Sequence, residues 1–114
     1  MDMEVCTDCF ISPVGKETAE YVRDHLHENL IIAMNNPDLN STEKQLEYAF
    51  YMTDIESKNA GVKNSGSTCV CVVLRNEGDK RVLYSANAGD SRSVLYSSGR
   101  TQRLSKVRLV ILCE

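Results

Sequence analysis

The sequence has no long hydrophobic run and no basic cluster. Its longest strongly apolar stretches, residues 70–74 and 109–113, fall far short of the ~20 residues that span a bilayer. Thirteen Lys and Arg stand against sixteen Asp and Glu, for a formal net charge of -3. The phosphate backbone of a nucleic acid is held by clustered positive charge, which this sequence lacks, so we predict that nucleic acid is not a partner. The short apolar stretches likewise predict that a membrane is not a partner.

The chain also lacks the marks of a secreted, disulfide-bonded protein. Residues 1–9 carry three acidic side chains and no basic one, which is the wrong charge for a secretory signal. Five cysteines cannot all pair within one chain, so we expect reduced thiols and a cytoplasmic location, with the nucleus as the alternative. Cys6 and Cys9 have the spacing of half a zinc site or of a redox dithiol. No second half follows, and buried or incidental thiols are favoured.

What is present is the composition of one globular domain: 114 residues, 42% hydrophobic and 25% charged. Ser12 as N-cap and Pro13 at the first helical position predict a helix that runs to about Met34. Its apolar stripe recurs at steps of three and four residues and consists of Ala19, Val22, Leu26 and Leu30. His25 and His27 diverge too far on a helix to share a metal, so we expect them to face solvent.

A second helix is predicted after the helix-breaking segment Asn35-Asn36-Pro37-Asp38. Ser41 or Thr42 caps this helix, with Gln45 as the capping-box partner. The helix is expected to fade over residues 57–59. Its apolar side consists of Leu46, Ala49, Phe50 and Ile55.

The sequence pattern changes after residue 64. Residues 68–74 are almost continuously apolar, as expected for a strand covered on both faces. Residues 75–80 predict a hairpin loop. Further strands are predicted over residues 81–87, 93–96 and 100–104. Two helices followed by consecutive antiparallel strands predict an α+β fold, with the two helices packed on a β-meander.

The strand-rich half carries Ser65-Gly66-Ser67-Thr68 before one strand and Ala86-Asn87-Ala88-Gly89-Asp90-Ser91-Arg92 at the end of the next. A further strand, a turn at Gly99 and Leu104-Ser105 follow. In this order and spacing, the motifs resemble the metal-dependent serine/threonine protein phosphatases of type 2C, the PPM family. The resemblance covers about residues 9–105 and implies part of the family's α-β-β-α sandwich. We therefore predict a partial phosphatase domain over residues 1–105 and an unrelated apolar tail over residues 106–114.

The resemblance implies a chemistry that needs carboxylates. In the family, two divalent cations, usually Mn or Mg, share a water that attacks a phosphoserine or phosphothreonine ester of a phosphoprotein substrate. The family segment before the first helix is Phe-Asp-Gly-His-Gly-Gly, whose aspartate bridges the metals and whose histidine acts on the leaving group. Its first glycine gives a carbonyl ligand.

This chain departs from the family at that segment. Ile11 stands in place of the bridging aspartate and Pro13 in place of the histidine, so we predict no catalytic residue here. Ser12 keeps only a backbone carbonyl as a metal ligand. Asp90, in Gly-Asp-Ser-Arg, is the one family metal position that remains, with a turn carboxylate as the alternative interpretation. We therefore expect no tightly bound Mn or Mg.

The function follows from these departures. The resemblance predicts a member of the protein serine/threonine phosphatases that is itself inactive, and the alternative is a pseudophosphatase or a protein-interaction fragment. A small interaction domain unrelated to phosphatases is disfavoured by the ordered motifs.

The resemblance ends abruptly after Ser105, as altered splicing, a frameshift or a gene-model error would cause. Residues 107–113 combine β-propensity with an apolar end. They are predicted to pair with an exposed strand edge of their own molecule or of another molecule. The second pairing would give self-association.

Overall fold

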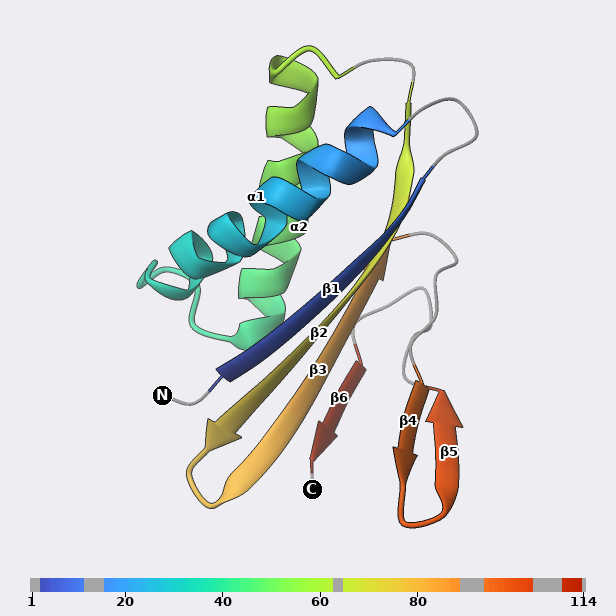
Figure 1. The fold of residues 1–114 in the computed structure, drawn as a ribbon. Helices are drawn as coiled ribbons and strands as arrows, with labels where there is room; N and C mark the ends of the chain where they lie inside the picture. Colours follow the sequence, from blue (N-terminus) through green and yellow to red (C-terminus); the bar gives the residue numbers. More distant parts are fainter. Residues whose placement is uncertain (1–2, 12–15, 63–64, 89–93, 104–109, 114) are drawn as a thin grey trace. The chain divides into compact units, whose positions relative to one another are not determined.

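The structure, a computed structural model, describes residues 3–11, 16–62, 65–88, 94–103 and 110–113 (Figure 1). The chain divides into two compact units, residues 9–67 and residues 1–8 with 68–114. Two helices and antiparallel strand pairs confirm the predicted α+β class. The elements in chain order are β1 (Met3–Ile11), α1 (Glu17–Met34), α2 (Thr42–Asn59), β2 (Ser67–Glu77), β3 (Lys80–Ala88), β4 (Val94–Ser97), β5 (Arg100–Arg103) and β6 (Val110–Cys113).

The helical unit is built on the apolar stripes of α1 and α2. In α1, Ala19, Leu26 and Leu30 are buried as predicted, together with Ala33. In α2, the buried apolar residues are Leu46 and Ala49. A buried hydrogen bond of 2.9 Å from Asn29 Nδ2 to Thr53 Oγ1 joins the two helices. Within the described ranges, neither helix contains a stretch apolar enough to cross a membrane.

The start of α1 differs from the prediction. The helix begins at Glu17, with Lys16 in the N-cap position and no side-chain cap hydrogen bond, so Ser12 is not its N-cap and Pro13 is not its first residue. β1 extends the chain as far as Ile11, and Gly15, which is unfavourable inside a helix, lies just ahead of the observed start. The end at Met34 agrees with the prediction.

The start of α2 agrees with the prediction in position and differs in detail. Ser41 is the N-cap, and its hydroxyl accepts a hydrogen bond of 3.3 Å from the backbone N–H of Lys44. Because Ser41 is the N-cap, the capping-box position is that of Lys44 and not that of Gln45. The side-chain amide of Gln45 instead donates to the carbonyl oxygen of Leu39 at 2.9 Å, which ties the incoming loop to the helix. The helix ends at Asn59, as expected.

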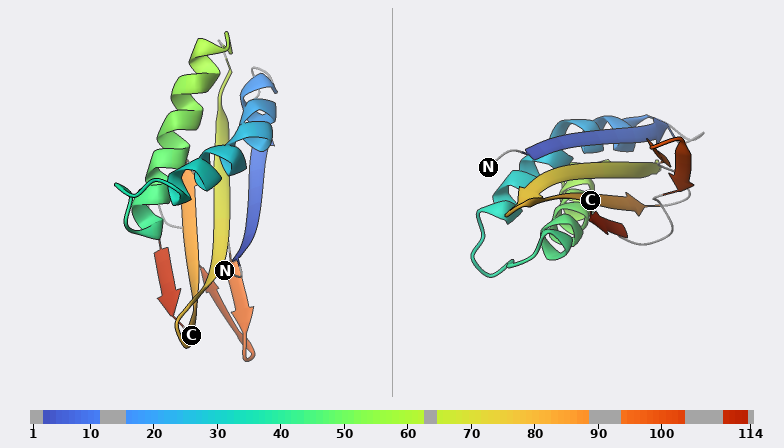
Figure 2. Two further views of the ribbon diagram at one scale, coloured as in Figure 1. Left: turned by 90° about the vertical axis from the view of Figure 1, so that its left-hand side faces the viewer. Right: turned by 90° about the horizontal axis from the view of Figure 1, so that it is seen from below.

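The strands form two sheets rather than one continuous meander. One has four strands in the order β1-β2-β3-β6, and the other has the two strands β4 and β5 (Figure 2). β2 and β3 are antiparallel over the register from Cys69↔Ala88 to Glu77↔Lys80. Gly78, with φ +63°, closes this hairpin, because its positive φ favours a residue without a side chain. β1 is a strand that the sequence analysis did not predict.

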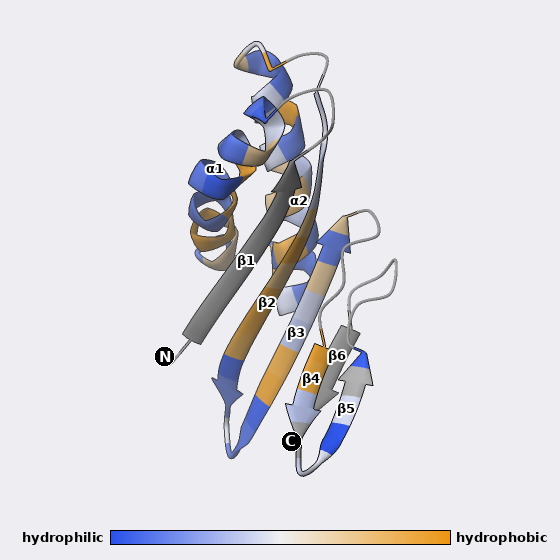
Figure 3. Cartoon of the chain, turned by 45° about the vertical axis from the view of Figure 1, so that its right-hand side comes forward, coloured by the Kyte–Doolittle hydropathy of each residue, from blue (hydrophilic) through white to orange (hydrophobic). Residues whose placement is uncertain are grey.

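The core of the strand unit lies on one face of the β2–β3 hairpin. Residues that oppose each other in an antiparallel pair share a face, and this face carries Cys69, Cys71, Val73, Val82, Tyr84 and Ala86, all buried. On the other face, Val70 and Ser85 are also buried. In Figure 3, β2 has apolar colouring along its middle, β3 has apolar colouring on the stretch toward the turn, and the turn between the two strands is polar. Cys69 and Cys71 are reduced, buried thiols.

The apolar tail forms the strand β6, which pairs antiparallel with β3. The register runs from Val82↔Cys113 to Ser85↔Val110. The sequence allowed this tail to pair with an edge of its own molecule or of another. The structure contains the first of these two pairings.

Candidate functional site

Most of the site residues predicted from sequence lie outside the described residues. Ser12, Pro13 and Asp90 fall in the gaps at residues 12–15 and 89–93. Ile11 is placed as the last residue of β1, with α1 as the next helix in the chain. The position that the resemblance assigns to a metal-bridging aspartate is therefore at the end of a strand, and the residue there is apolar.

The β2–β3 hairpin pairs the residues after Thr68 with the end of β3, where the second predicted phosphatase motif begins at Ala86. Cys69 pairs with Ala88 and Val70 pairs with Asn87. Thr68 comes just before these pairs in the chain, at the same end of the hairpin as Asn87 and Ala88. The turn at Gly78 is at the opposite end, so the nine paired positions hold this open end at a fixed register.

The side chains described at this open end offer only neutral oxygen atoms to a cation. They are the hydroxyl of Thr68 and the amide of Asn87, both half-buried. Mn and Mg are hard cations that are usually held through carboxylates as well as neutral oxygens. Over the described ranges, no group of three or more His, Cys, Asp or Glu could hold a metal ion. The described donor set therefore does not fit a two-cation centre.

A hydrogen bond that the sequence analysis missed fixes the approach to β2. The hydroxyls of Thr18 and Ser65 are 2.6 Å apart and partly buried. Thr18 lies in the first turn of α1, and Ser65 begins the Ser-Gly-Ser-Thr motif. The bond joins residues 47 positions apart, and no local sequence pattern predicts a pairing over such a separation. It ties the start of the Ser-Gly-Ser-Thr motif to the first turn of α1.

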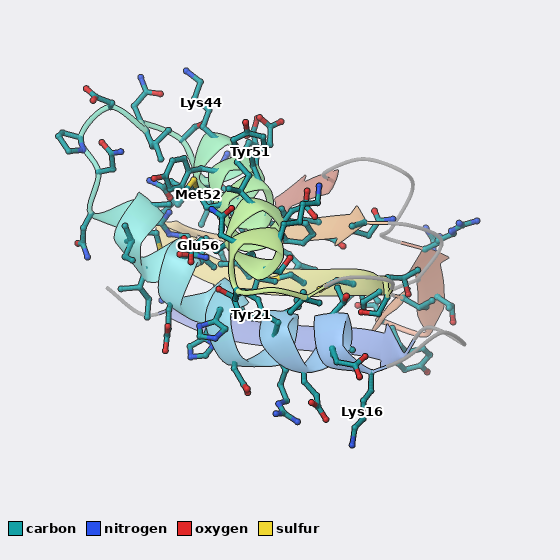
Figure 4. The ribbon with its side chains drawn as sticks, turned by 90° about the horizontal axis from the view of Figure 1, so that it is seen from above. Lys16, Tyr21, Lys44, Tyr51, Met52 and Glu56 are labelled. Carbon is teal, nitrogen blue, oxygen red and sulfur yellow. The ribbon has the colours of Figure 1, made fainter. Side chains whose placement is uncertain are left out.

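The surface of the helix pair carries a cluster of titratable groups. The rings of Tyr21 and His25 have centroids 4.1 Å apart, and His25 Nδ1 is 3.4 Å from Glu28 Oε2. Desolvation, followed by the negative charges of Glu56 and Glu28, raises the pKa of Tyr21. Figure 4 labels Tyr21 on α1 and Glu56 on α2, with Lys16 projecting away from both helices. His25 is thus half-buried and in tilted ring contact with Tyr21, whereas His27 is exposed as predicted.

Comparison with known proteins matches this chain to protein phosphatases of type 2C, both by family profile and by individual relatives. The family profile described as Protein phosphatase 2C matches residues 4–109. The chain is 35% identical over 99 residues to "Probable protein phosphatase 2C 76" of Arabidopsis thaliana, which covers 80% of this chain and 21% of that protein. It is 33% identical over 96 residues to "Probable protein phosphatase 2C 52" of Oryza sativa subsp. japonica, with 81% and 18% covered. The chain thus spans about a fifth of the length of these curated relatives.

Proposed function

The chain belongs to the protein phosphatase 2C family, and from this membership we propose that it carries part of a serine/threonine phosphatase domain but does not hydrolyse phosphate esters by itself. The parent activity is metal-dependent hydrolysis of phosphoserine and phosphothreonine in phosphoproteins. The observation that carries the proposal is Ile11, which ends β1 ahead of α1 where the family segment has its aspartate.

The side chains at the key positions do not suit the parent chemistry. In that chemistry, the paired cations lower the pKa of a shared water. Isoleucine has no lone pair for a cation, and proline has no side-chain proton to give to a leaving group. The described donors at the open end of the hairpin, the side chains of Thr68 and Asn87, are neutral and supply no carboxylate. A lone Asp90 does not supply a two-cation site either.

The first prediction is that the purified chain with manganese does not hydrolyse a phosphothreonine peptide or p-nitrophenyl phosphate. We expect a rate equal to that of manganese in buffer, because no carboxylate bridges two cations here. Phosphate release measured over a series of chain concentrations checks this. An active family phosphatase assayed in parallel shows that the assay works. A manganese-dependent rate that scales with the chain and persists through repurification would contradict the proposal.

The second prediction concerns the double variant Ile11→Asp with Pro13→His. It should stay inactive, because it restores one carboxylate and one imidazole but none of the distant aspartates that the resemblance implies after Ser105. Isothermal titration with manganese measures metal binding, and the same phosphate-release assay measures hydrolysis. Each single variant serves as a matched control. If the double variant turned over substrate while both single variants did not, our account of the missing ligands would be wrong.

The alternative function is that of a non-catalytic interaction fragment. Its support is a set of large apolar side chains at the surface. Val94 and Tyr96 on β4 are 57% and 73% exposed, and Ile31 and Ile32 on α1 are 51% and 58% exposed. These side chains lie within one strand and at one end of a helix. Exposed apolar side chains that lie close together are typical of protein-binding surfaces. A cytoplasmic or nuclear location remains a prediction from the sequence.

A further inference from the structure

The pairing of β6 with β3 is non-local. After Ala88 the chain forms β4 and β5, which make a separate sheet, and only then returns as β6. Ser85 and Val110, the paired residues closest in sequence, are 25 positions apart. The β2–β3 pairing, in contrast, closes through a tight turn between Glu77 and Lys80. A pairing over a long connection has a smaller entropic advantage within one chain than a hairpin does.

The sequence of β6 contains nothing that prevents pairing with another chain. Its residues are Val110, Ile111, Leu112 and Cys113, without charge or proline. Edge strands of monomeric proteins are normally protected by charged residues, proline or bulges. The family match ends at residue 109, so β6 lies beyond the matched region. β6 is held to the sheet by the register with Val82–Ser85.

We propose that β6 is exchanged between two copies of this chain, so that β6 of each copy occupies the β3 edge of the other. An antiparallel ladder forms the same hydrogen bonds whether its two strands belong to one chain or to two. Reciprocal exchange has two-fold symmetry, and it closes because each copy gives one strand and receives one. The product is therefore a dimer rather than a growing chain.

The register identifies a β6 strand as the occupant of this edge, and a second copy carries the same strand. The segment already seated on β3 is β6 itself, in a defined register of four pairs. An identical β6 from a second molecule fits the same positions without any change of sequence. The balance between the two forms depends on protein concentration relative to the effective concentration of the tethered strand. The dimer fraction must therefore rise with concentration.

The register supplies a direct test, because Val82 lies opposite the native Cys113. One chain carries Val82→Cys with Cys113→Ser, and a second, tagged chain keeps both native residues. Neither chain alone can form the link between these two positions, so a disulfide between the V82C thiol and Cys113 requires exchange. We expect such a linked heterodimer after mild oxidation of the mixture. In the mainly monomeric range, its fraction should rise about tenfold when the concentration rises tenfold.

Peptide mapping by mass spectrometry identifies the linked cysteines. The matched control, Leu83→Cys with Cys113→Ser, places the thiol on the opposite face of β3 and should give no link to Cys113. A second pair, Ser85→Cys in one chain and Val110→Cys in the other, both with Cys113→Ser, covers the case in which V82C fails to fold. A third variant carries V82C together with the native Cys113. If V82C is linked to Cys113 only within single chains of this variant, and never between chains, the proposal is overturned. Equal links from the Leu83 control, or no link in any mixture, would also overturn it.

Discussion

Leu30→Ala should destabilise the chain by about 2–5 kcal/mol, the usual cost of truncating a buried leucine to alanine. Leu30 is 1% exposed and lies on the α1 stripe next to Asn29, which bonds to Thr53 of α2. Removing its isobutyl group loses buried apolar contacts and leaves a cavity in the helical unit. Urea denaturation followed by far-UV circular dichroism measures the loss as a lower unfolding midpoint with an unchanged slope.

The matched control is Ile32→Ala, two residues away on the same helix. Ile32 is 58% exposed, so its truncation removes little buried surface, and alanine has the higher helix propensity. We expect a change within about 0.5 kcal/mol, as for most surface substitutions. Equal losses from the two variants would show that the burial assigned to α1 is incorrect.

The helices were predictable because their signals are local. The stripe through Leu26 and Leu30 and the polar cap at Ser41 are patterns that a few neighbouring residues specify. The start of α1 was misplaced because Ser12 and Pro13 satisfy the same local rules as a real N-terminus. The unpredicted strand β1 extends through Ile11, and the helix begins only at Glu17. A signal for β1 was present in the β-branched and aromatic residues Val5, Thr7, Phe10 and Ile11.

The strand half was predictable in its hairpins and not in its sheets. The polar turn after residue 75 and the Ser98-Gly99 turn mark the two hairpins, because both contain residues with positive φ. The choice of β1 and β6 as further neighbours of the β2–β3 hairpin depends on contacts distant in sequence. The Thr18–Ser65 bond has the same character. For the site, the motifs identified the candidate positions; Ile11 is placed at the end of β1, and Asp90 remains a prediction because it lies outside the described residues.

Deletion of residues 106–114 should destabilise the protein and increase its non-specific association. From sequence alone, the tail is predicted to give self-association by pairing with an exposed strand edge. Because β6 pairs with β3 of its own molecule, the deletion uncovers the backbone of β3 from Val82 to Ser85. Hydrogen bonds contribute about 0.5–1.5 kcal/mol each, so loss of this short ladder should cost about 2–4 kcal/mol. The uncovered edge is then available to other strands.

Sedimentation velocity of the intact and deleted chains at matched concentrations measures the association. We expect monomer and dimer from the intact chain, because strand exchange closes on itself. The deleted chain lacks a strand to exchange and should instead give a broad distribution of larger species, because its open β3 edge has no closed partner. A truncation that removes only Glu114 keeps β6 and should behave as the intact chain does. A deleted chain that is monomeric and as stable as the intact one would show that β6 does not protect the β3 edge.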